Sequence, residues 1–448
     1  MKLTKPQKAI SVAFFLIFSG EAILKITEEL FAPRIKLSLG INNISREDKH
    51  TGLRFGNAWD DNWYYAYLPS TIIDNDLDFE NQINEGFGTT VRPQAQKLLG
   101  EKFRTETGLV PNKYPAGFAI TLVPSFVTAH FFSLILFKLT QSPFFYPNGY
   151  SVLYILFCVL QIALMAFLMF ALFAKAAADI FRMSDRSIIL SVLSYLFASN
   201  YLWYLTQEPF MCHIVSGSWV AFSVYGILRY SQSVKFHWFC FSLVSFSFAI
   251  ITRPTNIFLS LILAPSIWMH RREIFSNLGK YSVAVFCFIP ISLQMLVWKA
   301  IYGHYVYYSY GGEGFNWLSP SLFLTLFSSN HGLFFWSPAI ILSLLGLVKM
   351  VGSKHNSSIS ITFLLSFTAL WYLNSSWHCW WFGDAYGARA FIEFGYMFLF
   401  GFAFFFESVF SYVRKSCIYL LVIILVSLNI IIMCLYLLKI LPHAGYLF

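Results

Sequence analysis

The sequence predicts an all-α, multi-pass membrane protein. Of its 448 residues, 57% are hydrophobic and only 12% are charged, which is about half the charged fraction of a typical soluble domain. Apolar runs of about 20 residues recur along the chain, and a run of that length can cross a bilayer as a helix. We therefore expect one domain, residues 1–448, with about 11 transmembrane helices.

The first expected element is an apolar stretch at 9–26 that follows a basic segment. It has the layout of a signal peptide, but it lacks a small-residue cleavage site and many apolar runs follow. We therefore expect a retained first span within 1–26, then an extracytoplasmic loop at 27–149 that carries in-plane helices. The remaining spans are expected within 150–448, at 150–175, 187–206, 210–229, 236–251, 254–270, 281–300, 332–349, 359–375, 390–411 and 417–438.

The run at 116–137 is also apolar, and the distribution of basic residues guides its interpretation. If the N-terminus is cytoplasmic and 116–137 does not cross, the Lys and Arg clusters between the later spans face the cytoplasm, as the positive-inside rule requires. We therefore expect 116–137 to be a helix or hairpin in the outer leaflet, with Pro124 and His130 marking a broken, partly wet element. The alternative, an ordinary span, would give about 12 transmembrane helices. The same clusters explain the net charge of +9 without a role for nucleic acid.

Three polar segments are expected outside the membrane, at 27–115, 301–331 and 376–389. The first contains Asp60 and Asp61, two adjacent carboxylates among tryptophans and tyrosines. A carboxylate that is partly removed from water binds protons more strongly, so either Asp can act as a general base. The pair can instead hold a divalent cation or belong to a solvated acidic loop.

A further acid, Glu208, lies in the very short turn between the spans 187–206 and 210–229. A charge held between two helix ends is costly unless it is paired or functional. We therefore expect Glu208 and the nearby His213 to reach the same cavity as the two Asp residues. The alternative is a Glu that merely ends a helix at the interface.

Three cations on the same side break the positive-inside trend. Lys113 precedes the 116–137 run, Arg253 lies in a short turn, and Arg389 ends the third polar segment. Cations grouped at an outer face suit the binding of a phosphate group. The alternative for each one alone is that its side chain extends to lipid headgroups.

Aromatic and histidine side chains of the outer segments can contact a sugar or an acceptor. Trp side chains at a membrane surface commonly anchor a protein in the interface, but their flat faces also suit sugar rings. The candidates for lining the site are Trp63, His213, His331, His378 and Trp381.

In the order of these motifs, the sequence resembles the GT-C class of integral-membrane glycosyltransferases, especially bacterial relatives of protein O-mannosyltransferases and lipid A aminoarabinose transferases. The similarity covers most of the chain. It includes an acid in the first outer loop, a Lys-containing segment before an in-plane helix, a second acid after a later span, and an Arg-Pro pair. The matching residues are Asp60-Asp61, Asn112-Lys113-Tyr114-Pro115, Glu208-Pro209, Arg253-Pro254-Thr255 and the segment from Gly332 to Pro338.

The family pattern has one departure here. The family usually shows Asp-Glu or Asp at a fixed distance from a Tyr. In this chain Asp60 precedes Tyr64 and Asp61 precedes Tyr65 at the same spacing, so the base is not assigned uniquely.

The resemblance implies transfer of a sugar from a polyprenyl-phosphate carrier to an acceptor hydroxyl. Asp61 or Asp60 would be the general base, and Glu208 would orient the acceptor or, with Asp61, hold a divalent cation such as Mg, Mn or Zn. The residues implied to bind the phosphate end of the donor are Lys113, Arg253, Arg389 and Tyr65.

The expected partners are therefore a polyprenyl-phosphate-linked sugar, membrane lipids, and a lipid, glycan or protein acceptor. The expected location is a bacterial inner membrane, with a cytoplasmic N-terminus, an extracytoplasmic active site and a role in the cell envelope. A lipid-linked sugar flippase or transporter is one alternative, although internal repeats and midspan ionisable residues would favour it and neither is evident. A non-catalytic subunit of a polysaccharide assembly complex is another.

Overall fold

The structure, a computed structural model, is helical throughout its described part. It describes residues 4–14, 17, 59–87, 95–97, 99, 103–353, 356–438 and 440–441. Most of the predicted first span, 9–26, and the 27–58 part of the first outer loop lie outside these residues. Within the described ranges there are no β-strands, and the isolated bridge between Phe315 and Trp377 is the one β-type pairing.

The apolar runs predicted within 150–448 all form helices, several of them in consecutive pieces. The longer α-helices are α2 (Trp59–Pro69), α4 (Gly117–Thr140), α5 (Val152–Asp179), α6 (Asp185–Phe197), α8 (His213–Ser233), α9 (Phe236–Thr252), α13 (Ile289–Tyr302), α16 (Ile340–Val351), α17 (Ser357–Ser376), α18 (Gly395–Val409) and α19 (Lys415–Leu437). The short ones are α7 (Tyr201–Thr206), α10 (Ala264–Met269), α11 (Arg271–Ser276), α12 (Leu278–Ser282), α14 (Leu322–Phe327) and α15 (Leu333–Trp336). Tighter or wider turns form η1 (Ser70–Asp74), η2 (Gln82–Gly86), η3 (Pro143–Phe145), η4 (Pro254–Ile262), η5 (Val283–Phe288) and η6 (Arg389–Phe394).

Five helical stretches in the described part are long and apolar enough to cross a membrane. Together with the all-helical fold they agree with a helical membrane protein, while the count of about 11 spans stays a prediction. The five are Gly117–Thr140, Val152–Asp179, Leu278–Tyr302, Arg389–Val409 and Lys415–Leu437.

The ambiguous run at 116–137 forms one unbroken helix, α4, so the predicted hairpin and broken element are wrong. Pro124 lies inside it without ending it. Gln161 of α5 donates a hydrogen bond to the carbonyl of Thr121 (2.6 Å) and accepts one from Ser125. These bonds join α5 to α4 on both sides of the proline, which is how a neighbouring helix stabilises a proline within a membrane helix. The in-plane position of α4 stays a prediction.

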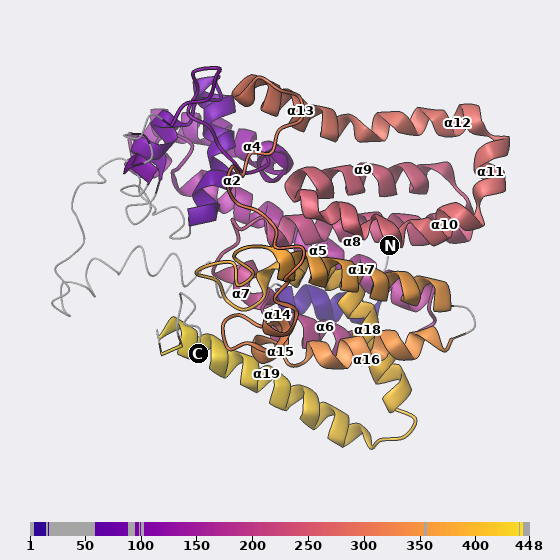
Figure 1. The fold of residues 1–448 in the computed structure, drawn as a ribbon. Helices are drawn as coiled ribbons and strands as arrows, with labels where there is room; N and C mark the ends of the chain where they lie inside the picture. Colours follow the sequence, from indigo (N-terminus) through magenta and orange to yellow (C-terminus); the bar gives the residue numbers. More distant parts are fainter. Residues whose placement is uncertain are drawn as a thin grey trace.

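The helices lie roughly along one direction, which gives the molecule two distinct ends (Figure 1). The turn formed by α11 lies at one end, on the right of the view, together with the connections from α16 to α17 and from α18 to α19. The start of α2 and the loops beside α14 and α15 lie toward the other end. This arrangement agrees with the prediction that the basic segments between spans share one side. The orientation of that side relative to the cell stays a prediction.

The predicted span 187–206 is broken into α6 and α7. Where a helix breaks inside a buried region, its freed carbonyls need other donors. The side-chain amide of Asn429, on α19, donates to the carbonyls of Phe197 (2.9 Å) and Ser199 (3.0 Å). The break is thus stabilised by a helix more than 200 residues later, a pairing that local sequence patterns do not reveal.

Helices α16 and α18 pack closely where two glycines, Gly346 and Gly401, face each other. A Cβ atom added to Gly346 would lie 1.8 Å from the carbonyl oxygen of Gly401, and Ser343 donates to the carbonyl of Phe398 (2.7 Å). Small residues let helix backbones approach in this way, and polar side chains then bond across the contact.

Substitution of Gly346 by Ala should therefore destabilise the protein, because backbone atoms cannot move aside as a flexible side chain can. We expect a loss of about 1–3 kcal/mol, the usual range for overpacking, seen as a lower melting temperature of the purified protein. Gly279→Ala is the matched control, since no atom lies within 4 Å of a Cβ at that position. Equal melting temperatures for the two variants would show that α16 and α18 are not so closely packed.

Candidate functional site

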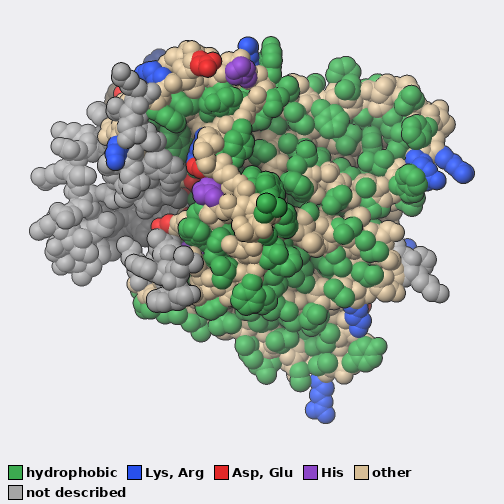
Figure 2. All heavy atoms as spheres, viewed as in Figure 1, with side chains coloured by type: hydrophobic (Ala, Val, Ile, Leu, Met, Phe, Trp, Pro, Cys, Tyr) green, Lys and Arg blue, Asp and Glu red, His purple; other side chains and the backbone are tan. Residues whose placement is uncertain are grey.

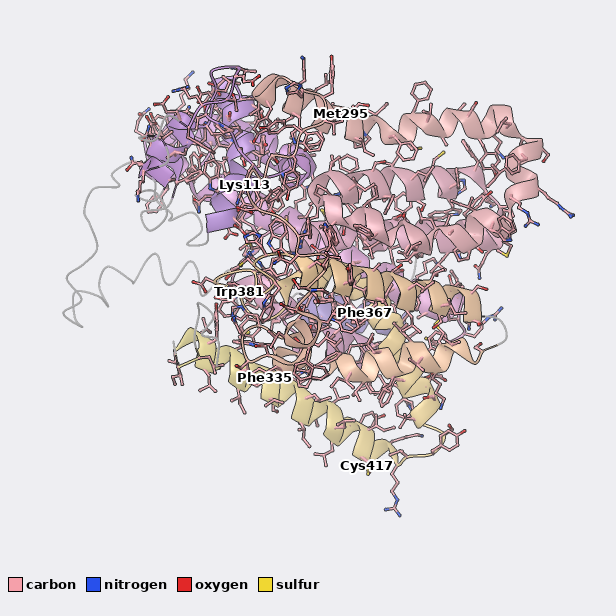
Figure 3. The ribbon with its side chains drawn as sticks, viewed as in Figure 1. Lys113, Met295, Phe335, Phe367, Trp381 and Cys417 are labelled. Atoms are coloured by element: carbon pink, nitrogen blue, oxygen red, sulfur yellow. The ribbon has the colours of Figure 1, made fainter. Side chains whose placement is uncertain are left out.

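A cavity of about 580 Å³ lies among the polar segments at one end of the bundle. Its walls come from the start of α2, the segment before α4, the junction of α9 with η4, the loop after α13, and the segment between α17 and η6. Figure 2 shows acidic, basic and histidine side chains gathered beside a recess, within a mostly apolar surface. In Figure 3, Lys113 on the α4 side and Trp381 beyond α17 lie at this end, whereas Cys417 lies at the other.

Asp60 reaches this cavity from the first turn of α2. A helix N-terminus favours a negative charge in its first turn, so this placement suits an ionised carboxylate. Its Oδ1 accepts a hydrogen bond from the hydroxyl of Tyr114 (2.5 Å), and its Oδ2 pairs with Nη2 of Arg389 (2.7 Å). Burial raises the pKa of Asp60, but Arg389, the Tyr114 hydroxyl and Lys113 together outweigh it, so the pKa lies below its usual value. Asp60 is therefore a carboxylate at neutral pH.

Asp61 is next in the sequence but is not part of the described cavity lining. Its side chain is buried, and its Oδ1 has no hydrogen-bond partner among the described residues. Burial, and then the negative charges of Glu208 and Asp60, raise the pKa of Asp61 well above its usual value. The pKa values of the two adjacent acids are therefore shifted in opposite directions, that of Asp60 downward and that of Asp61 upward.

The opposite pKa shifts predict opposite effects of removing each acid. The pKa of Asp61 is higher in the folded protein than in the unfolded chain, where it is about 4. Its contribution to stability is therefore fully present below about pH 4 and is lost as the pH rises through the folded-state pKa. Asp61→Asn should therefore gain melting temperature relative to wild type as the pH increases from 4 to 8. Asp60→Asn should do the reverse, because a lowered folded pKa contributes stability above the unfolded value and loses it as the pH falls. Two curves of the same slope would contradict this assignment.

Glu208 lies in the turn between α7 and α8, as the sequence predicts. Burial raises its pKa even though Arg389 and a side-chain hydrogen bond with Trp203 lower it, and its Oε2 has no hydrogen-bond partner among the described residues. Its charge influences the pKa of Asp61, so the two acids lie near each other. Neither is part of the described cavity lining.

The predicted metal site at Asp61 and Glu208 receives no support from this arrangement. Within the described residues, no group of three or more His, Cys, Asp or Glu side chains could hold a metal ion. Asp61 and Glu208 are thus two acids without a third ligand among the described residues, and the proposed chemistry involves no metal.

A second buried ion pair lies behind the cavity. Arg253, which lines the cavity at the end of α9, donates from Nη1 to Oε1 of Glu393 (2.9 Å). The same Glu393 oxygen lies 2.8 Å from Nδ1 of His213, and Arg253 Nη1 also lies 2.8 Å from that nitrogen. Glu393 is on η6, one turn after Arg389, so one short helix supplies a partner to each of two separate charge pairs.

The third predicted cation, Lys113, pairs with Glu313 from the loop after α13. Its ammonium group also lies 5.4 Å from the ring centres of Tyr114 and Tyr310, close enough for a cation–π interaction. Ser309 donates a hydrogen bond to the backbone carbonyl of Lys113 (2.6 Å). The loop is thus bonded to the segment before α4 across the cavity.

The remaining predicted residues divide between the cavity and the core. His213 and His378 line the cavity, together with Lys113, Arg253 and Arg389. Tyr65 does not, because it is fully buried and its hydroxyl donates to the carbonyl of Gly149 (2.6 Å).

Three predicted sugar-lining residues lie outside the described cavity lining. Trp63 is buried and packs edge-on against Phe87 at 4.8 Å between ring centres. The ring Nδ1 of His331 lies 2.9 Å from the carbonyl oxygen of Trp381. Neither His331 nor Trp381 belongs to the lining. Trp63 and Tyr65 are therefore core residues, and neither they nor His331 and Trp381 are part of the described cavity lining.

Several residues that build the site, either in the cavity wall or behind it, are not among the sequence-predicted candidates. Tyr114 is part of the Asn112-Lys113-Tyr114-Pro115 motif, and its position next to Lys113 could have indicated that it lines the cavity. Glu393 had a weaker signal, an acid four residues after Arg389 in an otherwise apolar run. The aromatic wall also includes residues outside the predicted set, namely Trp298, Tyr307, Tyr308, Tyr310, Phe315 and Trp317.

The fold and this site together define a helical membrane protein with a charged, aromatic-walled cavity at the polar end of its bundle. No protein-family model, no curated protein and no solved structure matches the chain. The function therefore has to be argued from the cavity itself.

Proposed function

We propose that this protein transfers a sugar from a polyprenyl-phosphate carrier to an acceptor hydroxyl, with Asp60 as the general base. The supporting observation is the composition of the cavity wall. The ionised carboxylate of Asp60 lines it together with Glu313, Lys113, Arg253 and Arg389 and with a row of aromatic rings. Such a wall suits a ligand with an anionic group and a flat-faced ring.

The chemistry assigns a part to each charge. The acceptor oxygen bonds to the anomeric carbon while the bond from that carbon to the phosphate oxygen breaks, through an oxocarbenium-like state. The bonding electron pair goes to the phosphate, and the acceptor proton goes to Asp60. Arg253 and Lys113 stabilise the charge that the leaving phosphate gains.

The depressed pKa of Asp60 is compatible with this role. A carboxylate has about four lone-pair positions, and the bonds from Tyr114 and Arg389 occupy two of them. The carboxylate therefore keeps acceptor capacity for a hydroxyl. The Asp60 carboxylate needs to accept the proton only late in the reaction. The acceptor hydroxyl becomes strongly acidic once its oxygen has begun to bond to the anomeric carbon, and a carboxylate of low pKa can then take the proton.

Glu313 competes with the donor phosphate for Lys113. A carboxylate and a phosphate that pair with the same ammonium group repel each other, so we expect donor binding to open the Lys113–Glu313 pair. The proposal places the reaction at the extracytoplasmic face of a bacterial inner membrane, with a lipid, a glycan or a protein as acceptor.

The test uses purified protein in lipid nanodiscs and a panel of radiolabelled polyprenyl-phosphate sugars. Loss of label from the lipid, with release of free polyprenyl phosphate, is the expected result. In parallel, proteoliposomes report whether intact labelled lipid crosses the bilayer. Movement of intact lipid without consumption would replace the enzyme proposal by a flippase.

A further inference from the structure

We infer that Glu393 is a positioning residue, which holds the guanidinium of Arg253 at the cavity wall so that it can bind the phosphate group of a prenyl phosphate. The inference rests on the proposal that the cavity takes a phosphate-bearing ligand. It does not depend on sugar transfer, because it concerns only how the phosphate is bound.

The two members of the Arg253–Glu393 ion pair are buried to different extents. The Glu393 side chain is 2% exposed and Arg253 is 14% exposed, and only Arg253 belongs to the cavity lining. The acid therefore lies behind the arginine and bonds it from the protein side at 2.9 Å. A guanidinium carries five N–H donors, so those not used by Glu393 or His213 remain for a ligand.

The charge balance explains why a Glu is needed at this position. An Arg buried without an acid is strongly disfavoured, and a long flexible Arg loses side-chain entropy when it is fixed. Glu393 offsets the cost of burying the Arg253 charge. It also fixes the Arg253 side chain before a ligand arrives, so that less side-chain entropy is lost on binding. Because the Glu393 carboxylate balances the charge of Arg253, the ion pair is close to neutral overall. The guanidinium N–H groups that face the cavity can still donate hydrogen bonds to a ligand.

The same acid also fixes His213. One imidazole nitrogen cannot accept a hydrogen bond from Arg253 and donate one to Glu393 at the same time. Both partners approach Nδ1, so whichever bond forms, the ring is restrained between them. Glu393, on η6, thereby fixes two cavity-lining side chains, Arg253 at the end of α9 and His213 at the start of α8.

The test measures binding of geranyl phosphate to the full chain in nanodiscs of zwitterionic lipid, with geraniol as the uncharged counterpart and empty nanodiscs as the partition control. Wild type should bind the phosphate more tightly than the alcohol. Glu393→Gln should weaken phosphate binding by about tenfold, the size of a hydrogen bond to a charged group, and should leave alcohol binding unchanged. Glu393→Asp, which keeps the charge, should recover part of the loss.

Two further variants separate positioning from a general structural effect. In an Arg253→Gln background, Glu393→Gln should cause no additional loss, because its effect passes through Arg253. Glu407→Gln is the matched control, since Glu407 is an acid of α18 that bonds Ser184 outside the cavity, and it should bind like wild type.

The outcomes distinguish the inference from the proposed function. Unchanged phosphate binding in Glu393→Gln, or equal losses for phosphate and alcohol, would overturn the inference alone. A wild type that does not prefer the phosphate over the alcohol would overturn both. Phosphate-selective binding that depends on Glu393, without any sugar transfer, would support the inference and reject the transferase.

Discussion

Asp60→Asn should reduce the rate of sugar transfer by a factor of about 10²–10⁴, the usual contribution of a general base. The substitution keeps the shape of the side chain but removes the charge that receives the acceptor proton. The loss should appear in kcat rather than in donor affinity, because Lys113 and Arg253 still bind the phosphate. Single-turnover kinetics with a saturating donor measure this directly.

Asp61→Asn is the control for that experiment, since it makes the same change at the next residue. Asp61 is buried, has a raised pKa and is not part of the described cavity lining, so its Asn variant should keep most of the wild-type rate. If Asp61→Asn abolished transfer and Asp60→Asn did not, the base would be the other acid. Both proteins must first show wild-type elution and cooperative melting, so that a rate change is not a folding defect.

The second large effect is on stability. Removal of one member of a buried ion pair leaves an uncompensated charge and typically costs about 3–5 kcal/mol. Arg389 is 9% exposed and joins η6 to α2 through Asp60, 329 residues earlier in the chain. Arg389→Gln should therefore lower the free energy of unfolding by an amount in that range, measured by denaturant titration in mild detergent.

Two comparisons test the cause of that loss. In the Asp60→Asn background, Arg389→Gln should cost less than it does alone, because the stranded partner charge is already gone. Arg414→Gln, at an exposed position before α19, should stay within about 0.5 kcal/mol of wild type. Strictly additive losses in the double variant would mean that the Asp60–Arg389 pair contributes no coupling energy.

The helices could be predicted because hydropathy and helix formation are local properties of the chain. The runs 150–175 and 417–438 became α5 and α19 with boundaries shifted by only a few residues. Breaks within runs were harder to foresee, since the one at 198–200 is stabilised by the distant Asn429. The continuity of α4 through Pro124 likewise depends on a neighbouring helix.

Part of the site could also be predicted, because charged residues at span ends on one side tend to share a compartment. That reasoning led to Lys113, Arg253 and Arg389, which all line the cavity. It could not decide between Asp60 and Asp61, since consecutive helical residues point about 100° apart and the orientation of α2 is set by packing. Nor could it separate the cavity-lining tryptophans from Trp63, because the core and the cavity wall use the same residue type.

The most direct test of the central claim is a structure of the Asp60→Asn variant in nanodiscs with a bound polyprenyl-phosphate sugar. The variant should retain the donor because the acceptor proton has no base. The account predicts that the phosphate contacts Arg253 and Lys113, that the Lys113–Glu313 pair is open, and that residue 60 faces the anomeric carbon. A donor bound elsewhere, with the Lys113–Glu313 pair intact and the cavity empty, would contradict it.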